Sequence, residues 1–266
     1  MTQTRPARIP LGMLPIRDHN PSGQTPCAGW VLIALNIVVF MAYYPLGSGT
    51  FVTGVYHDWG MIPARLSAGE GLWTPLTALF IHGGWFHLGL NLLFLWVFGP
   101  RVEAVMGSWR FVSFYLLCGM IATALQFLAN PGSAAPVAGA SGAVAGVMGA
   151  YLLLFPRAKV DLLVYYILGL RTLAVPAWAL LGLWFALQVW GGLATPASGG
   201  VAFWAHVGGF LAGVGLCARS WRLRGGRRIW RTQLAPPAGA PVAMPVVRRR
   251  GVVLPPPQPR GLFRRD

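Results

Sequence analysis

Six long apolar segments constrain this chain more than any other feature of its sequence. Hydrophobic residues make up 55% of its 266 residues and charged residues only 10%, whereas about a quarter of a typical globular chain is charged. A membrane-spanning helix needs about 20 predominantly apolar residues. The pattern therefore predicts an all-α polytopic membrane protein, a bundle of six transmembrane helices. The expected spans lie near residues 28–46, 75–99, 111–129, 141–155, 173–193 and 201–218.

Basic residues are distributed unevenly between the ends of these segments. Three arginines precede the first segment, five basic residues lie in the loops after the second and fourth, and twelve arginines follow the sixth. The other three loops together carry only Arg65. Because cytoplasmic loops carry the excess of Lys and Arg, we expect both termini to be cytoplasmic.

Composition divides the chain into three expected parts. Residues 1–27 form a cytoplasmic segment, 28–220 the membrane domain, and 221–266 an Arg- and Pro-rich tail. The tail cannot bury a core, so we expect it to be disordered and to lie against anionic lipids. It lacks interleaved aromatic residues, so nucleic acid is not an expected partner. The N-terminal sequence has no short apolar core followed by a cleavage site, so no cleaved signal peptide is expected.

The first outer loop, about 47–74, is unusually rich in aromatic and apolar residues. We expect it to lie partly in the membrane interface. The alternative is a small folded cap that makes no lipid contact.

Five polar side chains in the second, fourth and sixth predicted spans stand out. The second carries His82, His87 and Asn91, the fourth begins at Ser141, and the sixth has His206 near its start. His87 and Asn91 are four residues apart and so share one helix face. In the predicted orientation these three spans run from outside to inside, which places all five groups in the outer half of the membrane. Polar groups inside a bilayer are costly and indicate function.

The short fourth segment fixes a depth for Ser141. The 15 residues from Ser141 to Phe155 would span about 22 Å as a helix, against a hydrocarbon core of about 30 Å. Ser141 should lie roughly 8–10 Å below the outer surface. The preceding loop, 131–140, must descend to reach it. Irregular backbone is tolerated at that depth when it is shielded or lines a watery cavity, so we expect a pocket open to the outside.

Small residues predict that the fourth and sixth spans pack closely. They repeat every four positions, at Gly142, Gly146 and Ala150 and at Gly209 and Gly213. Such spacing lets two helix backbones approach. Close packing of these two helices could bring the Ser141 hydroxyl within hydrogen-bond reach of His206.

This pairing has chemical meaning, because a serine hydroxyl becomes a good nucleophile only when a neighbouring base takes its proton. No Asp or Glu lies in any predicted span, so a Ser–His dyad is the simplest arrangement. Asn91, His87 and the backbone N–H of Ser141 could stabilise the negative charge on an attacked carbonyl. Taken singly, the serine could be packing filler and the histidines and Asn91 structural. Their occurrence at one depth favours a site.

The motifs resemble those of the rhomboid family of intramembrane serine proteases over about residues 73–217. The pattern H-x4-H-x3-N covers His82 to Asn91, GASG at 139–142 is similar to the family's GxSG, and H-x2-G-x3-G begins at His206. PIRDHNP at 15–21 and LFPRAKV at 154–160 are also typical of bacterial members. The resemblance implies Ser141 as nucleophile and His206 as general base. It implies oxyanion stabilisation by Asn91, His87 and the backbone of Ala140, support from His82, Gly139, Gly142 and Gly209, and a structural carboxylate at Glu103.

Two positions depart from the family's pattern. Trp73 matches a tryptophan of the first outer loop, but Thr74 stands where an arginine is frequent. Ala145 stands where some members place an aromatic ring against the histidine. The packing around His206 and the stability of the loop are therefore left open.

These features together predict an endopeptidase of the bacterial inner membrane, without metal or cofactor. It would cleave single-span membrane proteins in or near their membrane segment, preferably where a helix is broken. One alternative is an inactive rhomboid-like protein that binds membrane partners. Another is a proton-coupled transporter, which would need ionisable groups in the inner half of the spans, where the sequence has none. Substrate identity and oligomeric state are not predicted.

Overall fold

The computed structural model describes residues 13–18, 25–45, 47–166, 169–195, 200–228 and 230. The C-terminal tail from 231 onward lies outside the described residues. Its expected disorder and lipid contact therefore stay predictions, as does the division of the chain into three parts.

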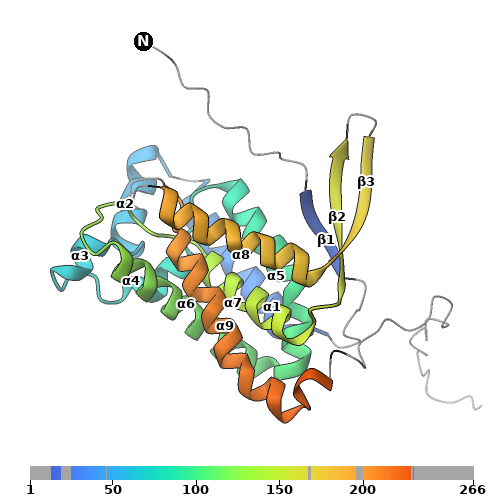
Figure 1. Ribbon diagram of the computed structural model, residues 1–266. Coiled ribbons are helices and arrows are strands. Elements are labelled where there is room, and N and C mark those ends of the chain that lie inside the picture. The colour runs from blue at the N-terminus through green and yellow to red at the C-terminus, as the bar shows by residue number, and fades with distance from the viewer. Residues whose placement is uncertain are drawn as a thin grey trace, which may run out of the picture. The chain divides into compact units, whose positions relative to one another are not determined.

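Each of the six apolar segments overlaps one long helix, and these helices pack together (Figure 1). They are α1 (Cys27–Tyr43), α5 (Trp85–Met106), α6 (Ser108–Ala129), α7 (Ser141–Leu154), α8 (Ala177–Ala194) and α9 (Phe203–Leu223). Helix α7 packs against α5, α6, α8 and α9, and 11 of its 14 residues are buried. A helix that is apolar on every side is a core helix, so α7 forms the centre of the bundle.

Three of these helices are long and apolar enough to cross a membrane by length and composition: α5, α6 and α8. Helices α1 and α7 are apolar but shorter, with 17 and 14 residues. The described part of the chain is thus mostly helical with three candidate spans, and the count of six stays a prediction.

The second predicted segment, 75–99, is wrong as a single helix. It contains the short helices α4 (Thr74–Thr77) and η1 (Ala78–Phe80), then an irregular stretch, and α5 begins only at Trp85. Gly84 has φ +148°, a conformation that glycine adopts and other residues rarely do. His82 therefore precedes the helix that carries His87 and Asn91.

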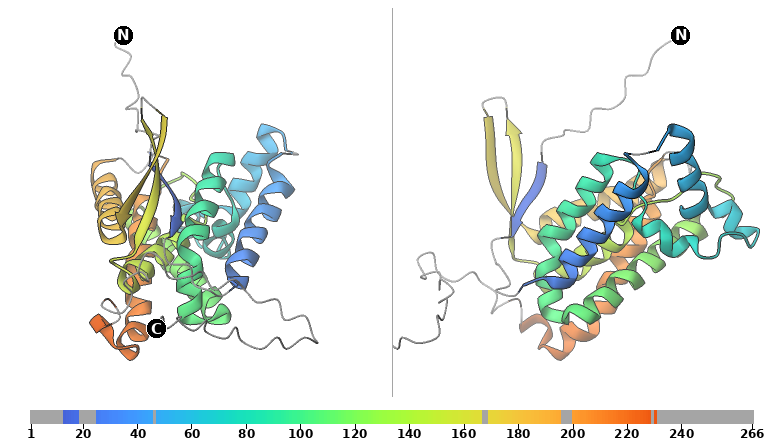
Figure 2. Two further views of the ribbon diagram at one scale, coloured as in Figure 1. Left: turned by 90° about the vertical axis from the view of Figure 1, so that its right-hand side faces the viewer. Right: turned by 180° about the vertical axis from the view of Figure 1, so that it is seen from behind.

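The fold is also not purely α-helical. Strands β1 (Met13–Asp18), β2 (Lys159–Tyr166) and β3 (Gly169–Pro176) form an antiparallel sheet in that order. The sheet stands beside the helices (Figure 2). The run KVDLLVYY of β2 is rich in β-branched and aromatic residues, as strands are. The fifth predicted segment, 173–193, accordingly begins inside β3, and α8 starts after Pro176.

Strand β1 is tied to the helical bundle by Asp18. The Tyr151 hydroxyl of α7 donates to Asp18 Oδ2 at 2.7 Å, and Arg101 of α5 lies 3.5 Å from the same oxygen. The Arg101 guanidinium also stacks 3.8 Å from the centroid of the Phe155 ring. An N-terminal segment that the sequence suggested only as a cytoplasmic leader is thus part of the folded unit.

Glu103 joins the start of α1 to the end of α5. Its buried carboxylate accepts hydrogen bonds from the N–H groups of Ala28 and Gly29 at 2.9 and 2.8 Å, and from the Ser108 hydroxyl at 2.6 Å. The first N–H groups of a helix have no intrahelical partner, so Glu103 caps α1 from another helix.

The loop predicted to face the outside, about 47–74, is folded into α2 (Gly49–Trp59) and α3 (Pro63–Ser67). Ser48 caps α2 by accepting from the Phe51 N–H at 3.4 Å. Large apolar side chains of this region remain exposed, among them Leu72 at 70% and Trp73 at 58%. Contact of this surface with lipid stays a prediction.

Helices α7 and α9 approach as closely as their glycine spacing predicts. A Cβ atom placed on Gly209 would lie 1.9 Å from the carbonyl oxygen of Gly142, and one on Gly213 would lie 1.9 Å from that of Gly146. No other residue fits at these two positions without moving backbone. The contact sets the distance between the N-terminal ends of α7 and α9, where Ser141 and His206 lie.

Candidate active site

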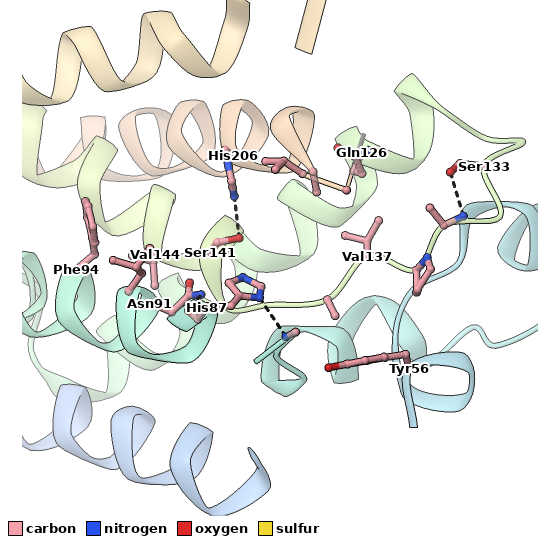
Figure 3. A pocket seen from close by; sticks show the side chains of 18 of the residues that line it. Tyr56, His87, Asn91, Phe94, Gln126, Ser133, Val137, Ser141, Val144 and His206 are labelled. Atoms are coloured by element: carbon pink, nitrogen blue, oxygen red, sulfur yellow. Dashed lines mark hydrogen bonds between the residues drawn. The ribbon is translucent and has the colours of Figure 1, made fainter. Parts of the chain in front are cut away.

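Ser141 and His206 meet between the first turns of α7 and α9. The Ser141 Oγ lies 2.8 Å from the His206 Nε2, a normal hydrogen-bond distance (Figure 3). Ser141 is the first residue of its helix, and His206 is the fourth of its helix. The structure thus brings the two side chains of the predicted pair within hydrogen-bond distance.

The other nitrogen of the His206 ring faces Gln188 on α8. His206 Nδ1 lies 2.7 Å from Gln188 Oε1. Trp184, one turn before Gln188 on the same helix, has its ring centroid 5.8 Å from that of His206. Gln188 was not predicted from the sequence, because a third member of such a site is usually a carboxylate and no Asp or Glu lies in the predicted spans. The available signal was that Gln188 interrupts an otherwise apolar helix.

His87 is oriented by the backbone before α5. The Gly83 N–H donates to His87 Nδ1 at 3.1 Å. Since Nδ1 accepts, the proton of the neutral ring is on Nε2, which leaves Nε2–H as a donor. A Cβ placed on Gly139 would lie 2.8 Å from that Nε2, so the donor lies against the backbone of the GASG motif.

Asn91 lies one helical turn below His87, on the predicted shared face. Its Nδ2 donates to the His87 carbonyl at 2.8 Å. Both residues line the cavity that contains Ser141. The Asn91 amide group has a second N–H that this hydrogen bond does not use.

His82 is fully buried and supports the loop instead of lining the cavity. The Ala140 N–H donates to its Nε2 at 3.4 Å, and its Nδ1 lies 3.3 Å from the Phe80 carbonyl. The Ala140 N–H, expected to serve a developing oxyanion, is therefore engaged with His82. The Ser141 N–H, at the first position of α7, has no partner within its helix.

The loop 131–140 is anchored at several points along its length. Val137 pairs with Met61 as an antiparallel bridge, the Gly139 N–H donates to the Ala78 carbonyl at 2.8 Å, and the Ser67 hydroxyl donates to the Pro131 carbonyl at 2.9 Å. These contacts fix the position of the loop that leads to the start of α7. Gly139 has φ +129°, a backbone conformation that favours glycine.

Ser141, His206, His87 and Asn91 all line one cavity of about 500 Å³. Figure 3 shows these side chains directed toward a common space, with Tyr56 at its far side. The remaining walls are mainly apolar and include Phe94, Val137, Val144, Met148 and Trp184. Ligand sites commonly combine such walls with a few convergent polar groups.

Burial raises the pKa of the Tyr56 phenol, whose hydroxyl donates to the His82 carbonyl at 2.8 Å.

The sequence matches the Rhomboid domain family over residues 69–222. That range is more than half of the chain and includes Ser141, His206, His87 and Asn91. The chain belongs to the rhomboid family.

Curated relatives agree with this assignment. The chain is 35% identical over 127 residues to the Rhomboid protease GluP of Bacillus subtilis, covering 48% of this chain and 24% of that protein. It is 34% identical over 142 residues to Rhomboid protein 1, mitochondrial, of Saccharomyces cerevisiae, covering 51% and 38%. It is 43% identical over 72 residues to Rhomboid-like protein 11, chloroplastic, of Arabidopsis thaliana, covering 27% and 25%. The chain thus spans less than two fifths of these relatives' lengths.

Membership in a membrane-embedded family accounts for the apolar helices, and the structure explains both departures from its pattern. Thr74 is buried and donates its hydroxyl to the Gly71 carbonyl at 2.7 Å, so it closes the local turn. Ala145 is fully buried in the core and offers no ring to His206. The aromatic ring beside His206 comes instead from Trp184 on α8.

Proposed function

We propose that this rhomboid is an intramembrane serine endopeptidase with Ser141 as nucleophile and His206 as general base. The observation that carries the proposal is the 2.8 Å contact between Ser141 Oγ and His206 Nε2, at the wall of a cavity of about 500 Å³. Relatives that are named proteases support the same reaction. An imidazole at this distance can take the proton of the serine hydroxyl, which makes the hydroxyl a good nucleophile.

The reaction would proceed by acylation and deacylation. Ser141 Oγ attacks the scissile carbonyl carbon while its proton passes to His206 Nε2. The negative charge on the carbonyl oxygen is stabilised by the Nε2–H of His87, the Nδ2–H of Asn91 and the N–H of Ser141. His206 then gives its proton to the leaving amine, and the C–N bond breaks. Water activated by His206 hydrolyses the acyl ester and restores the serine.

Ala140 contributes to this site through its peptide link to Ser141. Its N–H would reach the oxyanion only if its 3.4 Å bond to His82 opened. His82 and Gly139 hold the loop, and Gly142 and Gly209 hold α7 against α9.

The proposed topology has six spans in the inner membrane of a bacterium, with both termini cytoplasmic. Helices α5, α7 and α9 would begin in the outer half of the bilayer, which places Ser141 below the outer surface. Helix α7, with 14 residues, is about 21 Å long, shorter than a hydrocarbon core of about 30 Å. Residues 221–266 would form a basic cytoplasmic tail at the lipid surface.

The proposed substrates are single-span membrane proteins. A regular helix hides its carbonyl groups in its own hydrogen bonds, so a segment that unwinds easily should be cleaved first. No metal or cofactor is required by this mechanism.

The test is reconstitution of the full chain in lipid vesicles with a panel of single-span substrates, beside Ser141→Ala and His206→Ala. We expect cleavage by the wild type and none by either variant, and covalent labelling of Ser141 by a fluorophosphonate. Cleavage that persists in Ser141→Ala would refute the proposal. Binding of a substrate without cleavage or labelling would instead favour an inactive membrane-protein binder.

A further inference from the structure

We infer that Gln188 is a positioning residue that fixes the tautomer and orientation of His206. The inference rests on the proposed function, because it concerns the base of that reaction. In this inference Gln188 on α8 is a third residue that acts together with Ser141 and His206. It is a neutral amide, not the carboxylate that such sites often contain.

The hydrogen-bond direction carries the inference. Oε1 of Gln188 is a carbonyl oxygen and can only accept, so the 2.7 Å contact requires a proton on His206 Nδ1. In a neutral imidazole the other nitrogen, Nε2, is then an unprotonated acceptor. That nitrogen faces Ser141 Oγ at 2.8 Å. The contact therefore selects the tautomer that can take the serine proton.

The reverse orientation of the Gln188 amide group would prevent His206 from acting as the general base. If the Gln188 amide nitrogen faced His206, it would donate to Nδ1 and leave the proton on Nε2. That tautomer could not accept a proton from Ser141. The reaction thus depends on which end of one amide group faces the ring.

Gln188 lies behind the histidine ring and away from the substrate space. Ser141, His206 and Trp184 line the cavity, whereas Gln188 is not part of its wall. Trp184 and Gln188 are four residues apart, so they project from the same face of α8. The Trp184 ring is tilted by 40° to the imidazole, with the centroids 5.8 Å apart, and Gln188 contacts Nδ1, so both residues lie against the ring from the α8 side.

Close packing fixes the register of α8 against α9. A Cβ on Gly191 would lie 2.5 Å from the Phe203 ring, and one on Gly192 would lie 3.0 Å from the Trp204 ring. These contacts lie within one turn of Gln188 on α8 and of His206 on α9. The packing of α8 against α9 therefore holds the Gln188 amide group beside His206 Nδ1.

An amide suits this location better than a carboxylate. Gln188 is half-buried on an apolar helix, where a charged group must be paired to offset its desolvation, whereas a neutral amide needs only its hydrogen bonds. Helices α7, α8 and α9 contain no Asp or Glu. Gln188 can fix the tautomer without that cost, although it stabilises the imidazolium less than a carboxylate would.

The test compares Gln188→Leu, which keeps most of the side-chain volume and removes the acceptor, with Gln188→Glu, which keeps an acceptor. We expect Gln188→Leu to lower kcat about 10- to 100-fold with KM unchanged, and Gln188→Glu to restore most of that loss. Leu187→Ala, at the neighbouring position that is 54% exposed, is the matched control and should match the wild type. A rise in KM alone would show a substrate contact and overturn the inference.

A second readout does not depend on proteolysis. Nitrogen-15 spectra of the full chain with labelled histidine, in the Ser141→Ala background, report which nitrogen of His206 carries the proton. We expect a protonated Nδ1 with Gln188 or Gln188→Glu, and loss of that preference with Gln188→Leu or the equally long Gln188→Met. An unchanged tautomer in whichever of these two variants folds would overturn the inference.

The two proposals fail separately. If Ser141→Ala still cleaves substrate, the proposed function is wrong, whatever Gln188 does. If Ser141→Ala is inactive while Gln188→Leu keeps the wild-type kcat, only the role of Gln188 is wrong.

Discussion

Tyr43 and His82 are joined by two hydrogen bonds through a single hydroxyl. The Tyr43 oxygen accepts from the His82 N–H at 2.7 Å and donates to the His82 carbonyl at 2.8 Å. This links α1 to the irregular stretch before α5. Tyr56 donates to the same carbonyl at 2.8 Å, so the carbonyl has two donors while the N–H has one acceptor.

Replacing Tyr43 by Phe should therefore destabilise the protein more than replacing Tyr56 by Phe. The Tyr43→Phe variant leaves the buried His82 N–H without an acceptor, at a cost of about 1–2 kcal/mol in the free energy of unfolding. In Tyr56→Phe the carbonyl retains Tyr43. Thermal unfolding of both variants in the same detergent checks the order, and equal losses would contradict it.

Gly139→Ala should abolish most activity while the protein still folds. A Cβ at this position would lie 2.7 Å from the His87 ring, and φ is +129°. The His87 ring must then move away from the oxyanion position, and loss of one such donor lowers kcat about 100-fold. Gly132→Ala lies in the same loop with no heavy atom within 4 Å of its Cβ and is the control. Comparable turnover by the two variants would show that His87 does not act there.

Gly209→Ala tests the contact between α7 and α9. Its Cβ would meet the Gly142 carbonyl oxygen at 1.9 Å, so the helices must separate, at a cost of about 1–3 kcal/mol. Gly215→Ala, on the same helix, meets nothing within 4 Å and should be neutral or slightly stabilising. Denaturant or thermal unfolding measures both, and a normal stability for Gly209→Ala would mean that the helices are not held this closely.

The sequence was most informative where one helix supplied the whole signal. Glycine spacing predicted the α7–α9 contact, and the start of α7 at Ser141 followed from the apolar run. The His87–Asn91 pair lies on one face of α5 as expected. Each inference used a period that lies within a single helix.

The errors arose where distant segments determine structure. The stretch around His82 is apolar like a helix, but the positive φ of Gly84 and the hydrogen bonds from Tyr43 and Tyr56 keep it irregular. Strand β1 forms only because β2, about 145 residues later, pairs with it. Gln188 was not predicted for the same reason, because its partner His206 is on another helix. In addition, glutamine is seldom a member of a catalytic site.

Glu103→Gln should destabilise the fold without altering the catalytic step. The carboxylate accepts from the N–H groups of Ala28 and Gly29 and from the Ser108 hydroxyl. An amide has one acceptor end, and its NH2 would face an N–H donor, so we expect a loss of about 1–3 kcal/mol. Glu70→Gln, at an exposed carboxylate, is the control. Melting temperatures measure the loss, and a reduced kcat in the protein that remains folded would show that Glu103 does more than cap α1.

Trp184→Ala tests the aromatic contact that replaces the one missing at Ala145. Trp184 lies 5.8 Å from the His206 ring and 6.1 Å from the Phe210 ring, centroid to centroid. Aromatic pairs contribute about 0.5–1.5 kcal/mol beyond their burial, so a looser His206 should lower kcat about 3- to 10-fold. Trp184→Phe keeps a ring and should recover most of the activity.

Trp190→Ala is the matched control for this change, since Trp190 is on the same helix but 70% exposed. Its kcat and KM should equal those of the wild type. Because Trp184 also lines the cavity, Trp184→Ala is expected to raise KM as well. A change in KM with no change in kcat would assign Trp184 to the substrate alone, and the histidine would then be held from the α8 side by Gln188 without its neighbour.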